Sequence, residues 1–211
     1  MFRSDMSLMI EKVGNGDLDK MPYLAVFKKS GKTLVYLAAD HCTQKTFRMV
    51  DMAFQKFNPN IAVVEFEREG RRFEIKPGER MHESIYVAAI ANSRAVPVVK
   101  ADLSLEEMLQ LLRKLNPDRS FEMDGLIEVL TRHDKPEPIK KELDKLARPL
   151  ILNRNTLMAR EITNALNAHG TTLAVFGEAH YRHQQKIFED MLGPPEYIYS
   201  EHNLSTHVTP A

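Results

Sequence analysis

Three side chains of this 211-residue sequence have types and positions that could support catalysis: His41, Glu65 and His180. Each ends or closely follows a short apolar run typical of a β-strand, and parallel strands present their carboxyl ends at the sheet edge where ligands bind. Two imidazoles and one carboxylate are a common ligand set for a catalytic divalent ion, which makes hydroxide available near neutral pH. We therefore expect a metal centre if the fold gathers these side chains.

The role of Glu65 has two catalytic interpretations and a structural one. As a ligand it would coordinate the ion, and as a general base it would remain off the ion and accept a proton from water. In the structural interpretation Glu65 forms a salt bridge, because a carboxylate ending an apolar strand is costly unless it is paired. The candidate partners are Arg68, Arg71 and Arg154. The two histidines could likewise form only local hydrogen bonds at strand-to-helix turns.

A further candidate pair, Arg154 and Asn155, lies at the predicted start of a helix over residues 153–169. Asparagine is common at helix N-caps, so Asn155 could be a cap or a site residue. A cation near a helix N-terminus opposes the helix dipole, which indicates that a carboxylate or a substrate anion compensates Arg154. We include both as candidate catalytic residues, with Arg154 stabilising an oxyanion.

The surrounding sequence predicts an α/β fold in which a mostly parallel central sheet is flanked by helices. Short β-rich runs alternate with segments whose apolar residues recur at helical spacing, an order typical of parallel sheets. The chain is expected to begin this fold with a hairpin over residues 23–37. Further strands are predicted at 61–66, 96–99, 172–176 and 196–199, with helices at 43–57, 82–94 and 153–169 and another ending before Gly193.

Residues 103–149 interrupt this alternation and predict a helical insertion between the third and last strands. Ser104 and Glu107 form a capping-box pattern ahead of an amphipathic helix. Two shorter helices are predicted near residues 121–132 and 139–147, separated by prolines. All 211 residues are thereby expected to form a single domain that contains the insertion.

The composition argues against several classes of partner. Lysine and arginine total 29 and aspartate and glutamate total 29, so no basic field attracts a nucleic acid. The single cysteine cannot close an intrachain disulfide, which favours a reducing compartment. No apolar run approaches the roughly 20 residues needed to span a bilayer, and the first 20 residues do not resemble a signal peptide. We expect a cytoplasmic protein with no membrane partner.

Four short motifs, taken in order, resemble those of the TraB/Tiki superfamily, whose relatives include haem-binding ChaN proteins and erythromycin esterases. They are residues 36–41 (YLAADH), 62–65 (AVVE), 154–159 (RNTLMA) and 175–180 (VFGEAH). The family pattern has a Gly-x-x-His after a strand, a strand-terminal glutamate, an Arg-Asn helix and a second Gly-x-x-His. This sequence departs from it at Ala38, where the family has glycine. The resemblance touches most of the chain outside 103–149.

The resemblance implies an α/β fold and, in the Tiki branch, metal-dependent proteolysis with manganese or cobalt. It assigns His41 and His180 to the motif histidines, Glu65 to the family glutamate, and Arg154 and Asn155 to the helix pair. Our leading hypothesis is a metal-dependent hydrolase, with peptidases as one form, that uses Mn, Co or Zn on a peptide or small-molecule substrate. It allows a homodimer. The alternative is a non-catalytic protein that binds haem or another anionic small molecule, or a signalling protein of the same fold.

Overall fold

The sheet is the centre of the computed structural model, which describes residues 21–68, 81–115 and 137–199. Within these residues six strands pair in the order β4-β3-β5-β2-β1-β6. Strands β2 to β5 pair in parallel, while β1 is antiparallel to both β2 and β6, so the predicted mostly parallel sheet is confirmed. The strands are β1 (Tyr23–Lys29), β2 (Lys32–Ala39), β3 (Ile61–Glu67), β4 (Val98–Asp102), β5 (Thr171–Gly177) and β6 (Glu196–Ile198).

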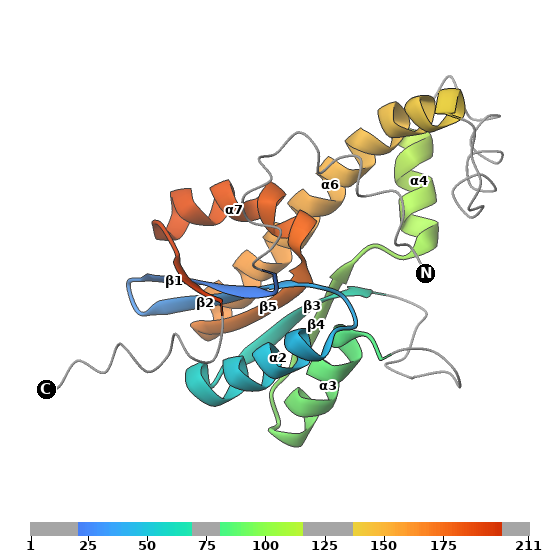
Figure 1. The fold of residues 1–211 in the computed structure, drawn as a ribbon. Coiled ribbons are helices and arrows are strands. Elements are labelled where there is room, and N and C mark those ends of the chain that lie inside the picture. The colour runs from blue at the N-terminus through green and yellow to red at the C-terminus, as the bar shows by residue number, and fades with distance from the viewer. Residues whose placement is uncertain (1–20, 69–80, 116–136, 200–211) are drawn as a thin grey trace, which may run out of the picture.

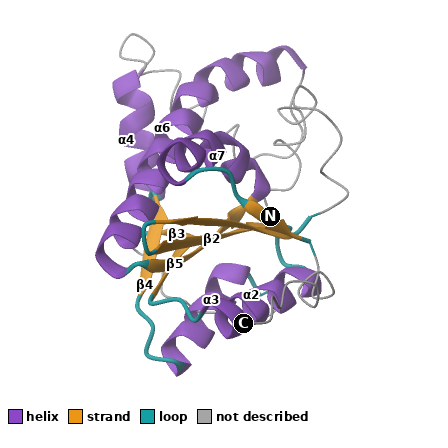
Figure 2. Ribbon diagram, turned by 90° about the vertical axis from the view of Figure 1, so that its left-hand side faces the viewer, coloured by secondary structure: helices purple, strands orange, loops and turns teal. Residues whose placement is uncertain are grey.

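Helices cover both faces of the sheet, as the sequence predicts. Figures 1 and 2 show α2 (Gln44–Phe57) and α3 (Glu83–Ser93) on one face, with α6 (Glu137–His169) and α7 (Glu178–Leu192) on the other. The remaining helix, α4 (Leu105–Leu115), packs against α6 at one end of the sheet. None of the helices in the described residues is both long enough and apolar enough to cross a membrane.

Burial on both faces explains why the central strands are apolar almost throughout. Successive strand residues point to opposite faces, so Val35 and Val175 join the core under α2 and α3. Their neighbours Tyr36 and Phe176 join the core under α6 and α7. Strands covered twice lose the alternation of a half-exposed sheet, which is why their sequences are continuous apolar runs.

Two predicted helix starts are confirmed by their caps. The Thr43 side chain accepts a hydrogen bond from the Thr46 N–H at the start of α2, and Asn58 ends that helix with a φ of 44°. At the start of α4, the Ser104 N–H donates to Glu107 Oε2 at 2.7 Å and the Glu107 N–H donates to Ser104 Oγ at 3.2 Å. This reciprocal pair is the predicted capping box.

The predicted start of the long helix near residue 153 is wrong. Helix α6 is continuous from Glu137 to His169, so it includes the predicted helix at 139–147 and passes through Pro149. Proline lacks only one N–H, and the Asn153 side chain donates to the Pro149 carbonyl at 2.9 Å. The predicted insertion boundary at 149 therefore falls inside a helix. The helix expected at 121–132 lies outside the described residues.

The strand predicted at 96–99 begins two residues later than expected, since β4 starts at Val98. The Val96 N–H donates to the Ala91 carbonyl at 2.8 Å, so Val96 is part of the turn that follows α3. Ala95 adopts a φ of 56° at this turn. The strand continues to Asp102, and this extension carries that carboxylate to the same sheet edge as Glu65.

Candidate functional site

The site lies where β3 and β5 pair side by side, at the carboxyl edge of the sheet. Glu65 is near the end of β3, Gly177 ends β5, and His180 is in the first turn of α7. Glu65 Oε1 lies 3.1 Å from His180 Nε2, and Glu65 Oε2 accepts a hydrogen bond from the Gly177 N–H at 2.8 Å. Parallel pairing thus unites residues 115 positions apart.

Asn155 fixes the tautomer of His180. The Asn155 Nδ2 donates to the Ile151 carbonyl at 2.9 Å, which turns Asn155 Oδ1 toward His180 Nδ1 at 2.8 Å. An amide oxygen only accepts, so His180 Nδ1 carries a proton. A neutral His180 then turns the lone pair of Nε2 toward the Glu65 carboxylate. Two acceptors facing each other require a proton or a cation between them.

A buried polar network supports Asn155 from behind. Gln184 Nε2 donates to the Asn155 carbonyl at 3.3 Å, and the Tyr36 hydroxyl donates to Gln184 Oε1 at 3.0 Å. Burial, with a contribution from the Glu65 charge, raises the pKa of Tyr36 well above its ordinary value, so the hydroxyl remains a donor. This network could not be predicted from the sequence, because the partners of Gln184 and Tyr36 lie far away along the chain and meet them only when α7 packs on the sheet.

His41 is held from the opposite face of the sheet. It follows β2, and its Nδ1 contacts Oε1 of Glu83, whose side chain is completely buried in the first turn of α3. The second oxygen of Glu83 accepts from the Cys42 N–H at 3.2 Å. Sequence analysis missed Glu83. Its one available signal was a carboxylate in the first turn of an otherwise alanine-rich helix.

Gly177 lets His41 reach the other two residues. A Cβ at this position would lie 2.5 Å from His41 Nε2 and 3.4 Å from Glu65 Oε2, so both atoms crowd the glycine. The backbone of Gly177 has an ordinary φ of −56°, and it is therefore this close approach that requires glycine. The fold thus puts His180 in contact with Glu65 and brings His41 to the same glycine that Glu65 contacts, near enough for the charge of His41 to affect the carboxylate.

The charges at the site are strongly coupled. Burial raises the pKa of Glu65, but His180, His41 and the Gly177 N–H outweigh burial and hold the pKa well below its ordinary value. Burial lowers the pKa of His41, whereas the hydrogen bond to Glu83 and the charges of Glu65 and Glu83 raise it to about 9. Glu83 likewise remains ionised, because His41 outweighs burial and lowers its pKa. The site is therefore built to hold positive charge between its carboxylates.

Two of the three arginines considered as partners of Glu65 pair with other carboxylates. Arg154 donates to both oxygens of Asp102, with Nε to Oδ1 at 3.0 Å and Nη2 to Oδ2 at 2.6 Å. Arg68 pairs with Glu161 at 3.1 Å. The third, Arg71, lies outside the described residues.

The structure also corrects the local roles expected of Arg154 and Asn155. Both lie in the interior of α6, so Asn155 is no N-cap and the helix dipole does not oppose Arg154. The carboxylate that compensates Arg154 is Asp102. Burial lowers the pKa of Arg154, but Asp102 and the nearby charge of Glu65 outweigh it and raise the pKa. Arg154 is therefore a permanent cation whose field reaches Glu65.

The donor set fits a divalent transition metal. His41 Nε2, His180 Nε2 and a Glu65 oxygen are the groups that could hold it, and they are ordinary ligands for Mn, Co or Zn. Their ligand atoms do not all lie within 4.8 Å of one another, so an ion would have to draw His41 closer to Glu65 and His180. Each has an outer partner that orients it: Glu83 for His41, Asn155 for His180, and the Gly177 N–H for Glu65. Such outer partners are characteristic of metal centres.

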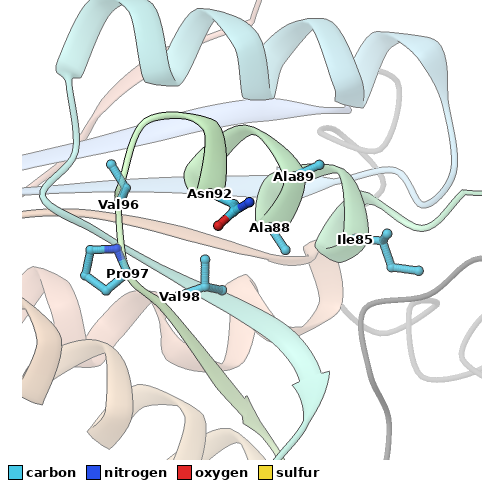
Figure 3. Close-up of a pocket in the computed structure, with 7 residues that line it drawn as sticks. All are labelled: Ile85, Ala88, Ala89, Asn92, Val96, Pro97 and Val98. Atoms are coloured by element: carbon cyan, nitrogen blue, oxygen red, sulfur yellow. The ribbon is translucent and has the colours of Figure 1, made fainter.

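A cavity of about 500 Å³ lies elsewhere, between α3 and the start of β4 (Figure 3). It is lined mainly by small apolar side chains such as Ala88, Val96 and Val98. None of its seven lining residues is ionisable, so the chemistry described above has no counterpart there.

Comparisons with models of protein families, with curated proteins and with solved structures gave no match to this chain.

Proposed function

We propose that this protein is a metal-dependent hydrolase of the TraB/Tiki type. The observation that carries the proposal is that His41 and His180 each have Nδ1 held by an outer partner. His180 Nε2 contacts Glu65 Oε1 at 3.1 Å, and His41 Nε2 and Glu65 Oε2 both approach Gly177. This is the arrangement that a histidine-histidine-carboxylate metal centre needs. The substrate class is a peptide or a small molecule with a hydrolysable acyl bond, and a cytoplasmic location belongs to the same proposal.

The chain's own residues have distinct roles in this reaction. His41, His180 and Glu65 would hold a Mn, Co or Zn ion, which when bound acts as a Lewis acid and makes a nucleophilic water available near neutral pH. Glu65 is ionised and has two oxygens, so it can accept a proton at the oxygen that the ion leaves free. The Gly177 N–H limits the rotation of that carboxylate.

Arg154 supplies fixed positive charge beside the reacting groups. Asp102 holds the guanidinium by two hydrogen bonds, so Arg154 is oriented before any substrate binds. A preorganised cation stabilises an oxyanion without the cost of reorganising solvent. Asp102 is accordingly a positioning residue, which acts on the substrate only through Arg154.

Metal binding tests the proposal directly. The protein is stripped with chelator and titrated with one equivalent of Co²⁺, whose visible absorption reports coordination by nitrogen and oxygen. We expect a new band and stabilisation of about 2.7 kcal/mol when the free ion is at 100 times its Kd. His180→Gln should weaken this first binding step by about 100-fold or more, because a ligand matters at least as much as its outer partner. The exposed His169, at the end of α6, gives the control His169→Gln.

Hydrolysis is then assayed on a peptide library and on carboxylic esters, with products identified by mass spectrometry. We expect Co²⁺- or Mn²⁺-dependent turnover that Glu65→Gln abolishes. A stripped protein that ignores Mn²⁺, Co²⁺ and Zn²⁺ in both stability and absorption contradicts the proposal. A Soret shift on adding haem, lost in His41→Gln and His180→Gln, would instead favour the non-catalytic ligand-binding alternative.

A further inference from the structure

A second cluster of metal-ligating side chains lies on the α3 side of His41. It contains His41, His82 and Glu83, and one ligand atom from each residue lies within 4.8 Å of the others. We refer to these three residues as the outer cluster. Two imidazoles and a carboxylate form a complete protein ligand set for a transition metal, with the remaining positions left to water.

The outer cluster is open to solvent at its rings and closed at its carboxylate. The side chains of His41 and His82 are 41% and 35% exposed, whereas Glu83 is completely buried. The two rings stack with centroids 5.3 Å apart, and His82 Nε2 lies 3.4 Å from Glu83 Oε1. An ion could therefore enter from water and meet a carboxylate that the fold already holds in place.

His82 can present a free lone pair to such an ion. Its Nδ1 lies 3.3 Å from the Ser84 N–H, which donates, and 3.2 Å from Ser84 Oγ. The Ser84 hydroxyl donates to the Glu65 carbonyl at 2.9 Å, so its oxygen is available to accept a hydrogen bond from His82 Nδ1. In one tautomer His82 Nδ1 accepts from the Ser84 N–H. In the other, Nδ1 donates to Ser84 Oγ in place of that bond and leaves the lone pair of Nε2 facing Glu83.

We propose that the outer cluster is a second binding site for a divalent transition metal, formed by His41 Nδ1, His82 Nε2 and Glu83. The ion would take the place of a proton between His41 Nδ1 and Glu83, because a ligating imidazole nitrogen must be deprotonated. This site involves neither His180 nor Glu65, and its existence does not depend on the proposed hydrolase activity.

The outer cluster and the proposed hydrolase site share His41. The consequence of this sharing rests on the proposed function. His41 has its Nε2 toward Glu65 and its Nδ1 toward Glu83. A neutral imidazole has one lone pair, so His41 cannot serve both ions at once. An ion in the outer cluster therefore withdraws His41 from the inner site, and excess metal weakens the inner site instead of filling both.

Zinc titrations of the full-length chain separate the two sites. His180→Gln disables the inner site, and we expect this variant to retain one Zn²⁺ per chain by calorimetry and by metal analysis. Adding His82→Asn should weaken that binding by about 100-fold or more. Asparagine is a good N-cap, so the variant keeps the cap that His82 provides for α3. His169→Gln is the matched control for loss of a histidine.

Nitrogen-15 NMR of the imidazoles supplies an independent readout. In His180→Gln, saturation with Zn²⁺ should shift His41 Nδ1 and His82 Nε2 as ligating nitrogens. Equal Zn²⁺ affinity in His180→Gln and in the double variant would overturn the proposal, as would unshifted His82 resonances. Loss of binding in His82→Asn alone, with retention in His180→Gln, would refute the inner site and leave the outer one standing.

Discussion

The two histidines beside Glu65 are held from opposite faces of the sheet and by different kinds of partner. His180 is buried, and the amide of Asn155 on α6 holds it. His41 is 41% exposed, and the carboxylate of Glu83 on α3 holds it. A neutral amide fixes a tautomer without adding charge, whereas a carboxylate also raises the basicity of the ring. The fold thus combines one rigid, neutral support with one charged support at the solvent boundary.

The largest effect on metal affinity is expected from a substitution at Gly177 that displaces the His41 ring. Gly177→Ala places a methyl group 2.5 Å from the present position of His41 Nε2. The part-exposed ring can swing out, so the fold should survive while the first Co²⁺ binds about 100-fold more weakly or worse. Calorimetry and thermal unfolding measure the two effects separately. Unchanged Co²⁺ affinity would mean that His41 does not contribute to the inner site.

The next largest effect is expected from removing Asn155, the neutral partner of His180. Asn155→Leu leaves the buried His180 Nδ1 without its acceptor, which should cost about 1–3 kcal/mol of stability, while the backbone carbonyl of residue 155 still accepts from Gln184 Nε2. Metal affinity should also fall by about 10–100-fold. Asn153→Leu, on the exposed side of the same helix, is the matched control for denaturant unfolding. Equal destabilisation by the two changes would contradict the role assigned to Asn155.

The pairing of His41 with Glu83 should make the free energy of unfolding depend on pH when chelator keeps the protein free of metal. The pKa of His41 is about 9 in the folded protein and ordinarily 6.5, so the folded state binds its proton more tightly. This contribution is complete below pH 6.5 and is lost as pH rises through about 9. The exposed ring makes the effect modest because solvent screens it. Denaturant unfolding at several pH values should show a flatter profile for His41→Gln, and parallel profiles would exclude the assigned pairing.

The smallest effect is expected at the far end of the buried network. Tyr36→Phe removes the donor to Gln184 Oε1 and changes little else, so it should cost about 1 kcal/mol of stability. Its effect on Co²⁺ affinity should be smaller than that of Asn155→Leu, since two residues, Gln184 and Asn155, separate Tyr36 from His180. An equally large loss of affinity in the two variants would show that the network acts as one unit.

Local signals made most of the fold predictable from the sequence. Thr43 and Ser104 mark helix starts through caps that involve only neighbouring residues. The apolar runs before His41 and Glu65 identify strands, and parallel pairing then places both residues at one edge. The error at Pro149 arose because proline is a strong local helix breaker, while packing along α6 overrides one missing hydrogen bond.

The residues that pair with His41 and Arg154 could not be predicted from the sequence, for a physical reason. Glu83 meets His41 only after α3 docks beside the end of β2, and Arg154 meets Asp102 across 52 residues. Ion pairs between distant residues leave no periodic pattern in the sequence, so neither pair could be predicted from residue spacing. The role of Gly177 is similar, because its need for a hydrogen side chain comes from His41, which is distant in sequence.

The position of β5 has a consequence for how the protein is made. This strand inserts between β2 and β3, yet it is synthesised after both of them and after β4. A nascent chain that lacks residues 171–177 therefore carries two unpaired strand edges, which are competent to aggregate. His180 follows immediately, so the last central strand to emerge both seals the sheet and delivers the final imidazole. We expect premature termination before that strand to leave both edges exposed and the polypeptide prone to aggregation.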